Sequence, residues 1–231
     1  MAESSNSTAS RAALRAVIVI ALCVLTSACG LSHLLPGSKS SSPTSHEVRA
    51  VRVASSTLIT EPGTTEPKVV LSLYEDFLCP VCGRFEQSFG QTVSKLISSG
   101  EVAADYYMVA ILDRSQNQNY SSRAGGAAYC VADADTAPDK GAFLRFHAAL
   151  FAKQPSETGS EFPSNADLAE TARQAGVDAL ECIDQGRYAE LSAGLAAATH
   201  VNATPTVRIN GEDYEFTTPD ALEAKVKELI G

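Results

Sequence analysis

Runs and repeats of apolar residues predict a mixed order of strands and helices along the chain. Short strands are expected at residues 51–53 and 57–59, and a buried strand at 68–74, where apolar residues dominate. Helical spacing then continues up to Gly100, carried by Cys82, Phe85, Phe89, Val93, Leu96 and Ile97. A second long strand is expected over residues 102–112.

The second half of the domain is predicted to be helical before it returns to strands. A helical region is expected over about 120–199, and its clearest apolar stripe consists of Phe143, Phe146, His147, Leu150 and Phe151. Residues 206–209 predict a short strand, and Asn210-Gly211 predicts a tight hairpin into a strand at 214–216. Thr218 as N-cap and Pro219 as first helical residue predict a final helix whose inward residues are Leu222, Val226, Leu229 and Ile230.

Residues 1–29 have the pattern of an export segment. Arg11 and Arg15 precede an uninterrupted apolar run at 16–25, and small residues then lead to Cys29. The run is shorter than the ~20 residues of a membrane-spanning helix, unless it continues through Leu31, Leu34 and Leu35. Leu-Thr-Ser-Ala before Cys29 resembles a bacterial lipobox, in which the cysteine becomes lipidated. Lipid anchoring, a cleaved signal and a retained anchor all place the main domain outside the cytoplasm, because the arginines stay inside.

A flexible linker is predicted at residues 30–47, which include a low-complexity Ser-rich stretch. Residues 48–231 then suffice for one packed domain. The net charge of −9 comes without a basic patch, so nucleic acid is not an expected partner. We expect an acidic, soluble surface that favours a monomer.

The cysteines divide between the leader and the domain. Cys23 and Cys29 belong to the leader, which leaves an even number in the domain: Cys79, Cys82, Cys130 and Cys182. Zinc binding is the competing use of a Cys-x-x-Cys pair, but it needs a second pair of ligands, usually at short spacing. The other two cysteines are far apart and the histidines are scattered, so we expect no metal.

Cys79-Pro80-Val81-Cys82 follows the buried strand and opens the helical repeat, which is the arrangement of a redox-active dithiol. The first cysteine is expected at the helix start, where unpaired N–H groups and the helix dipole stabilise a thiolate. The second lies one turn later, close enough to attack a mixed disulfide on the first. Pro80 suits the first turn because no N–H is needed there. A purely structural disulfide across a short turn is the alternative.

The order of these elements resembles an α/β thioredoxin-like fold interrupted by an all-helical subdomain at about 115–199. Tyr74-Glu75-Asp76-Phe77-Leu78-Cys79-Pro80-Val81-Cys82 and Val201-Asn202-Ala203-Thr204-Pro205-Thr206-Val207 are similar to motifs of the DsbA-like thiol:disulfide oxidoreductases. The resemblance covers residues 48–231 and looks closest to mycobacterial and actinobacterial members. It implies that Thr204-Pro205 forms the cis-proline loop, which faces the dithiol and pairs with the substrate backbone.

The resemblance also implies roles around the dithiol. Cys79 is the expected nucleophile, exposed at the helix start, and Cys82 is the resolving thiol, shielded by Phe85 and the sheet. Val81 stands where the strongest oxidants of the family often carry His, whose charge stabilises the thiolate, so a milder oxidant is expected. Thr204 is expected to contact the substrate near the reactive sulfur.

Two acidic residues directly precede the dithiol. One of them, Glu75 or Asp76, is a candidate to accept the proton of Cys82 during resolution. Relatives with a buried acid tend to place it earlier on the strand, at the position of Leu73, so a solvated acidic turn is the favoured interpretation. His147 on the apolar stripe is interpreted as a core or groove-lining residue rather than a catalyst.

Cys130 and Cys182 flank the helical insert, where actinobacterial relatives also have a cysteine pair. In an exported protein a structural disulfide is favoured over two free buried thiols. A second pair that takes part in thiol–disulfide exchange is the alternative. Closing this loop would stabilise the fold by roughly 4 kcal/mol in the chain-entropy model.

The leading interpretation is an exported thiol oxidase without a bound cofactor, acting on reduced or unfolded exported proteins. The resemblance implies reoxidation by a membrane partner, which in actinobacterial relatives is a quinone-linked protein similar to vitamin K epoxide reductase. One alternative is a disulfide reductase or isomerase kept reduced by an electron donor. Another is a non-catalytic thioredoxin-fold lipoprotein that binds extended peptides, against which the intact Cys-x-x-Cys argues.

Overall fold

The computed structural model describes residues 47–231. The leader, nearly all of the linker and the candidate lipidation residue Cys29 lie outside the described residues. None of the helices within residues 47–231 combines the length and the hydropathy that crossing a bilayer requires.

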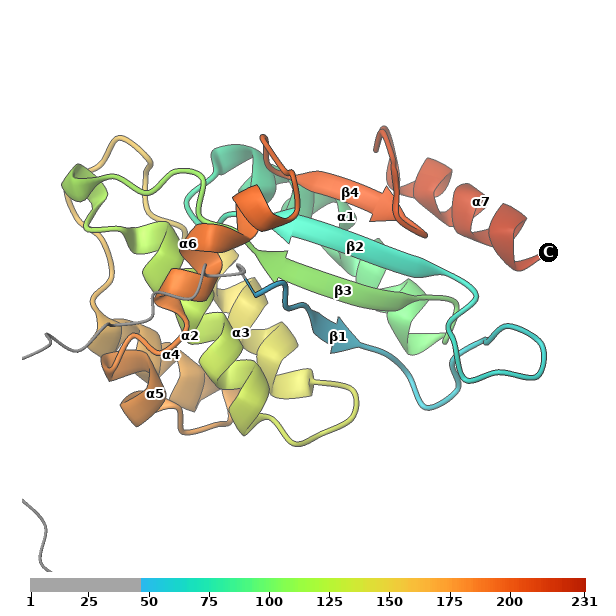
Figure 1. Ribbon diagram of the computed structural model, residues 1–231, viewed down its shortest axis with the longest axis horizontal. Helices are drawn as coiled ribbons and strands as arrows, with labels where there is room; N and C mark the ends of the chain where they lie inside the picture. Colours follow the sequence, from blue (N-terminus) through green and yellow to red (C-terminus); the bar gives the residue numbers. More distant parts are fainter. Residues whose placement is uncertain (1–46) are drawn as a thin grey trace, which may run out of the picture. The chain divides into compact units, whose positions relative to one another are not determined.

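A five-stranded mixed sheet forms the centre of the domain, in the order β1-β3-β2-β4-β5 (Figure 1). Its strands are β1 (Val51–Val53), β2 (Val70–Glu75), β3 (Ala103–Met108), β4 (Thr206–Ile209) and β5 (Glu212–Asp213). β2 and β3 run parallel, because a helix connects them, and the other neighbours run antiparallel. Leu71 and Leu73 on the central strand are at most 1% exposed, as the apolar run predicts.

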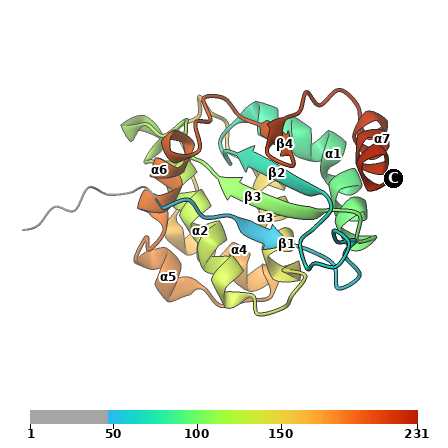
Figure 2. The ribbon, with the colours of Figure 1, turned by 45° about the vertical axis from the view of Figure 1, so that its right-hand side comes forward.

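The helices fall into two groups along the chain. α1 (Pro80–Ser98) joins β2 to β3, and α7 (Pro219–Ile230) follows β5. Between β3 and β4 lies the helical insert, which consists of the 3₁₀ turn η1 (Ser115–Asn117) and helices α2 (Tyr120–Ala134), α3 (Gly141–Ala152), α4 (Asn165–Ala175), α5 (Leu180–Asp184) and α6 (Ala189–Ala198). Figures 1 and 2 show these insert helices gathered at the end of the sheet away from α7. The thioredoxin-like α/β fold with an all-helical insert is therefore confirmed.

α1 forms where helical spacing and local signals agree. Pro80 is its first residue, directly after the extended residue Cys79, and the predicted apolar stripe is buried. The chain leaves the helix at Gly100, which has a φ of +80°. A Cβ there would lie 2.3 Å from the carbonyl oxygen of Thr57, so the close approach of the two backbones requires glycine.

The insert contributes to the core beside the dithiol rather than forming a separate lobe. α3 packs against α1, and its residue His147 is 3% exposed. Aromatic rings surround this imidazole at centroid distances of 5.0–5.9 Å, from Phe77, Tyr106, Phe143 and Phe151. The sequence interpretation of His147 as a core residue agrees with this burial.

The segment at 57–59 is not the strand that its apolar residues predicted. Ile59 donates its N–H to Gly100 and accepts from the N–H of Lys68, and in the described chain the pairing is limited to one isolated bridge between Thr60 and Pro67. The segment is therefore a loop, and it lies beside Gly100, just after the C-terminal end of α1.

The last strand is shorter and earlier than predicted. Both residues of the Asn210-Gly211 turn have positive φ, as a tight hairpin requires, and β5 begins immediately after them. The predicted strand at 214–216 is wrong, because Phe216 leaves the sheet and packs edge-on against Phe85 and Phe89 of α1. α7 begins as predicted, with the Thr218 hydroxyl accepting from the N–H of Ala221.

A disulfide joins Cys130 of α2 to Cys182 of α5, with the two Cα atoms 5.8 Å apart and 52 positions between them in the chain. The bond ties the first α-helix of the insert to its last but one, with α3 and α4 between them in the sequence. The structure therefore contains the pairing that was favoured for these cysteines.

Candidate active site

The dithiol lies where β2 passes into α1. Cys79 is the N-cap residue of the helix, Cys82 lies in its first turn, and both are free thiols. The peptide bond between Thr204 and Pro205 is cis, and the Thr204 carbonyl oxygen lies 3.4 Å from the Cys79 sulfur. The structure thus brings the two distant sequence motifs together.

The exposure of the dithiol differs from the prediction. Cys79 is only 7% exposed, whereas the neighbouring Val81 is 42% exposed. The loop carrying Thr204 lies against the sulfur and covers much of it. Cys82 is fully buried, in agreement with the expected shielding.

The two thiols differ strongly in acidity. The pKa of Cys79 falls to about 5, mainly because it accepts a hydrogen bond from the Cys82 thiol. The Thr204 hydroxyl and the N–H groups of Val81 and Cys82 stabilise the same thiolate. Burial raises the pKa of Cys82 far above its ordinary value, and the hydrogen bond to Cys79 adds to this. Near neutral pH the site therefore holds a Cys79 thiolate and a Cys82 thiol.

Asp76 is fully buried, so the predicted solvated acidic turn is wrong at this position. Burial raises its pKa to about 6. One carboxylate oxygen accepts the N–H of Leu78 at 2.8 Å and the other accepts that of Leu112 at 2.9 Å. Asp76 thereby ties the loop before the dithiol to the loop after β3.

Glu75 is only 3% exposed, so the solvated interpretation fails here as well. α3 covers this end of β2, and His147 places its Nε2 atom 3.0 Å from Glu75 Oε2. Burial raises the pKa of Glu75 to about 8 and lowers that of His147. Near neutral pH the contact therefore joins a protonated carboxyl, which donates, to a neutral imidazole, which accepts.

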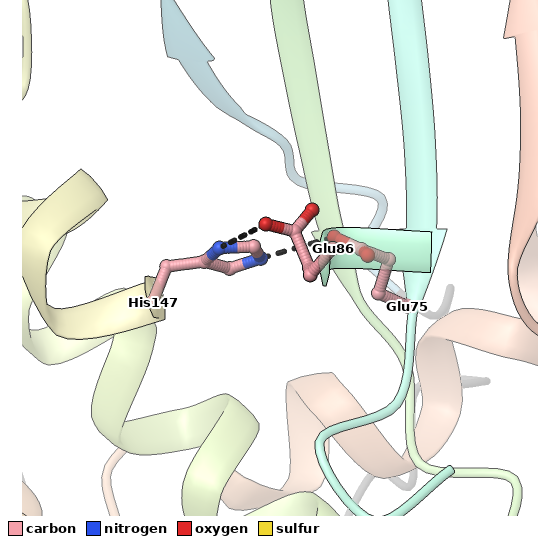
Figure 3. A group of neighbouring side chains, drawn as sticks. All are labelled: Glu75, Glu86 and His147. Atoms are coloured by element: carbon pink, nitrogen blue, oxygen red, sulfur yellow. Dashed lines mark hydrogen bonds and ion pairs between the residues drawn. The ribbon is translucent and has the colours of Figure 1, made fainter. Parts of the chain in front are cut away.

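Glu86 completes this buried group, and the sequence interpretation missed it. Its Oε2 lies 3.8 Å from Nδ1 of His147, and its carboxyl group lies beside that of Glu75 (Figure 3). Burial raises its pKa to about 7. Ligand atoms of the three side chains lie within 4.8 Å of one another, so they could also hold a metal ion. The available signal was the i, i+4 spacing from Cys82, which puts Glu86 on the same face of α1.

Gln154 is a second residue that the sequence interpretation missed. It follows α3, and its side-chain amide donates to the carbonyl oxygens of Phe77 at 3.0 Å and Cys79 at 2.9 Å. A Cβ on Gly83 would lie 2.5 Å from Gln154 Oε1, so the glycine makes room for this amide. Gln154 therefore holds the turn that carries the nucleophile.

An open cavity of about 440 Å³ continues from the cis-proline along the hairpin, lined by Pro205, Thr206, Val207, Asp213, Tyr214, Glu215, Phe216 and Thr217. Its lining combines apolar side chains with polar groups. An extended peptide could lie here with its sulfur near Cys79.

Comparison with known proteins gives the family and the fold. Residues 59–228 match the family described as Thioredoxin. The crystal structure of reduced DsbA from Mycobacterium tuberculosis is 60% identical, with a TM-score of 0.76, and covers 79% of this chain and 92% of that chain. MdbA, a thiol-disulfide oxidoreductase from Corynebacterium diphtheriae, has a TM-score of 0.58 over 79% of this chain and 94% of its own. At 21% identity it shows the fold alone.

Among curated proteins, the serine/threonine-protein kinase PknE of Mycobacterium tuberculosis is 30% identical over 147 residues. The match covers 62% of this chain but only 25% of the kinase, so it concerns a quarter of that protein's length. The Thioredoxin match, in contrast, spans most of this chain. The chain belongs to the thioredoxin family, and its fold is that of the DsbA-like thiol:disulfide oxidoreductases.

Proposed function

We propose that the chain is an exported thiol oxidase that introduces disulfide bonds into extracytoplasmic proteins through Cys79 and Cys82. The observation that carries this proposal is the opposite acidity of two neighbouring thiols beside a cis-proline. The pKa of Cys79 is lowered to about 5, and that of the buried Cys82 is raised. The similarity to DsbA of Mycobacterium tuberculosis supports the same reaction.

The proposed reaction moves two electrons from the client to the dithiol. A client thiolate attacks Cys79 in the oxidised protein, and Cys82 leaves and takes up a proton. A second client thiolate then attacks the client sulfur of this mixed disulfide, and Cys79 leaves as a thiolate. A thiolate with a pKa of about 5 is a good leaving group at neutral pH, which speeds the release of the oxidised client.

The direction of exchange follows from the same thiolate. Any group that stabilises the Cys79 thiolate stabilises the reduced protein and makes its disulfide more oxidising. The Val81 side chain is exposed and uncharged, so this residue contributes to the stabilisation only through its backbone N–H. We therefore propose an oxidant milder than family members with a histidine at this position.

Glu75 is the better candidate for proton exchange with Cys82. Both carboxylate oxygens of Asp76 already accept backbone N–H groups, which suits an anchoring role. Glu75 keeps one oxygen without a hydrogen-bond partner among the described residues, and when it is ionised its charge raises the pKa of Cys82. A carboxyl with a pKa of about 8 can both give and take a proton near neutral pH.

The setting of the reaction is proposed from the leader and from the site. The leader supports export, with anchoring either through a lipid on Cys29 or through the apolar run itself. Thr204, Pro205 and the adjoining cavity would hold an extended segment of a reduced or unfolded client. A quinone-linked membrane protein similar to vitamin K epoxide reductase would reoxidise the dithiol, and the protein would act as a monomer without a cofactor.

The decisive experiment measures the reduction potential of the purified protein against glutathione and follows oxidation of a reduced, unfolded client protein. A potential more oxidising than glutathione, together with client oxidation that Cys79→Ser abolishes, is expected. A strongly reducing potential without client oxidation would favour the disulfide reductase. Peptide binding that is unchanged in a protein lacking both thiols, without any client oxidation, would favour a non-catalytic binding protein.

A further inference from the structure

The proton of Cys82 has no open route to water at the front of the site. Cys82 is fully buried and Cys79 is 7% exposed, with the cis-proline loop against it. A client held by a mixed disulfide on Cys79 would cover this face further. Each turnover nevertheless requires Cys82 to gain one proton when it leaves and to lose one when the disulfide forms again.

A line of acid–base groups lies behind the dithiol. Glu75 Oε2 lies 3.0 Å from His147 Nε2, and His147 Nδ1 lies 3.8 Å from Glu86 Oε2 (Figure 3). The imidazole thus connects two carboxyl groups through its two different nitrogens. Because a neutral imidazole accepts at one nitrogen and donates at the other, it can pass a proton between them. The 3.8 Å between His147 Nδ1 and Glu86 Oε2 is too long for a direct hydrogen bond. A small movement of the Glu86 side chain, or a water molecule between the two atoms, would allow the proton to pass.

The outer end of this line reaches solvent. The Glu86 side chain is 15% exposed, against 3% for Glu75 and His147. Glu86 and His147 both line a cavity of about 410 Å³ that opens to the surface. A Cβ on Gly90 would lie 3.0 Å from Glu86 Oε2, so this glycine leaves space for the carboxyl group.

The surroundings let the proton move, because among residues 47–231 no Lys or Arg side chain forms an ion pair with Glu75, His147 or Glu86. Burial raises the pKa values of Glu75 and Glu86 to about 8 and about 7. Tyr106 on β3 also faces the imidazole, and burial raises its pKa well above the ordinary value, so it stays neutral. The other neighbours of the ring are the phenylalanines of the core. The Cys79 thiolate is a further charged group, and its charge acts on both Glu75 and Cys82.

We propose that Glu75, His147 and Glu86 form a proton path that connects Cys82 with solvent behind the active site. Its physiological use rests on the proposed function. When the disulfide closes, Cys82 gives its proton to Glu75, Glu75 passes a proton to His147 Nε2, and the Nδ1 proton leaves through Glu86 to water. The Cys82 thiolate then attacks the Cys79 sulfur, and the partner thiolate departs with the electron pair of the broken S–S bond. Client oxidation runs the path in reverse.

The test isolates closure of the dithiol with oxidised glutathione as the probe. Reduced protein is mixed with oxidised glutathione and quenched in acid between pH 6 and 9, and mass spectrometry counts reduced, glutathionylated and closed forms. We expect Glu86→Gln and His147→Phe to slow closure about tenfold, below the roughly 10²–10⁴-fold effect of losing a direct acid–base group. The rate at which Cys79 first attacks glutathione should not change. Glu223→Gln, which removes a carboxylate from the outer helix α7, is the matched control and should close like wild type.

A second readout separates proton transfer from packing. Added imidazole should restore closure in His147→Ala, and the pH dependence of closure should be weaker in Glu86→Gln than in wild type. Equal closure rates at every pH in wild type, Glu86→Gln and His147→Phe would overturn the path. A tightly bound metal ion would also overturn the path, if its removal by a chelator slows closure of the dithiol to the rate of these variants. Closure with glutathione needs no client protein. If the variants show these effects but the wild-type protein does not oxidise clients, the proposed function is wrong and the proton path still stands.

Discussion

The sulfur of Cys79 lies 3.4 Å from the carbonyl oxygen of Thr204, although 125 positions separate the two residues in the chain. The hydroxyl of the same threonine hydrogen-bonds the thiolate and lowers its pKa. The loop before the cis-proline therefore has two effects on the nucleophile. It covers the sulfur, and it stabilises its charged form.

Removing this hydroxyl should make Cys79 a weaker acid. In Thr204→Val we expect the pKa of Cys79 to rise, because the thiolate loses a donor while its burial remains. The thiolate absorbance near 240 nm, followed against pH, measures the change. Thr206→Val is the control, since that hydroxyl donates to the Ala203 carbonyl instead. An equal pKa in both variants would contradict the assignment.

The two thiols should react in a fixed order. At pH 7 an alkylating agent should label Cys79 much faster than Cys82, because only Cys79 is a thiolate and Cys82 is fully buried. Cys82→Ser should then accumulate mixed disulfides with clients, whereas Cys79→Ser should form none. Peptide mapping of the labelled protein checks the order, and faster labelling of Cys82 would show that the roles are reversed.

The reduced protein should gain stability over the oxidised protein as the pH rises. The pKa of Cys79 is about 5 in the folded protein against an ordinary value of 9.0. Between these values the unfolded reduced chain binds a proton that the folded chain lacks, so folding becomes more favourable with rising pH. The gain is complete above pH 9 and is lost as the pH falls to about 5.

Thermal unfolding of both redox forms between pH 5 and 8.5 measures this trend. The difference in Tm, reduced minus oxidised, should increase steadily with pH. Groups that titrate in both forms cancel in the difference. The Tm of reduced wild type minus that of Cys79→Ala should rise with pH in the same way, because the variant lacks the thiolate. A pH-independent difference would mean that the thiolate is not stabilised by folding.

The second disulfide should survive conditions that open the first. Cys130–Cys182 closes a long loop between two helices, and structural disulfides generally have lower reduction potentials than catalytic ones. Under graded reduction with glutathione we expect Cys79 and Cys82 to become free first. Mass mapping of alkylated peptides at each step provides the measurement. Simultaneous opening of both pairs would instead indicate a second exchange-active disulfide.

Loss of the Gln154 amide should loosen the turn that carries the nucleophile. Gln154→Ala leaves the carbonyl groups of Phe77 and Cys79 without their donor, at a cost of about 1–3 kcal/mol in unfolding free energy. The exposed Gln174, changed to alanine, is the matched control with an expected cost near zero. Chemical denaturation gives the free energies, and equal stability of both variants would count against the role of Gln154.

The elements that the sequence predicted well are those specified by neighbours in the chain. The apolar stripe of α1, its opening proline and the capping Thr218 of α7 are all local signals, and both helices begin where expected. The order of strands and helices then sufficed for the fold class. The segment ending in Phe216 could not be predicted in this way, because its packing partners lie more than a hundred residues earlier.

For the acid–base groups of the site, too, contacts between residues far apart in the chain could not be predicted. Glu75 was interpreted as solvated because relatives with a buried acid tend to place it earlier on the strand, at the position of Leu73. Its burial depends on His147, 72 positions downstream and on a different helix. The exposure of Cys79 likewise depends on the distant Thr204 loop. Glu86 was also missed, although its i, i+4 spacing from Cys82 is a local signal that places both residues on one face of α1.

The bond between Cys130 and Cys182 makes each new chain dependent on an oxidant before its own insert is closed. If the dithiol acts as proposed, finished copies can supply that oxidation to copies that are still folding. Production of the mature protein would then be self-accelerating, with a lag when no earlier copies are present. A cell that begins without any mature copy would need another oxidant to start the process.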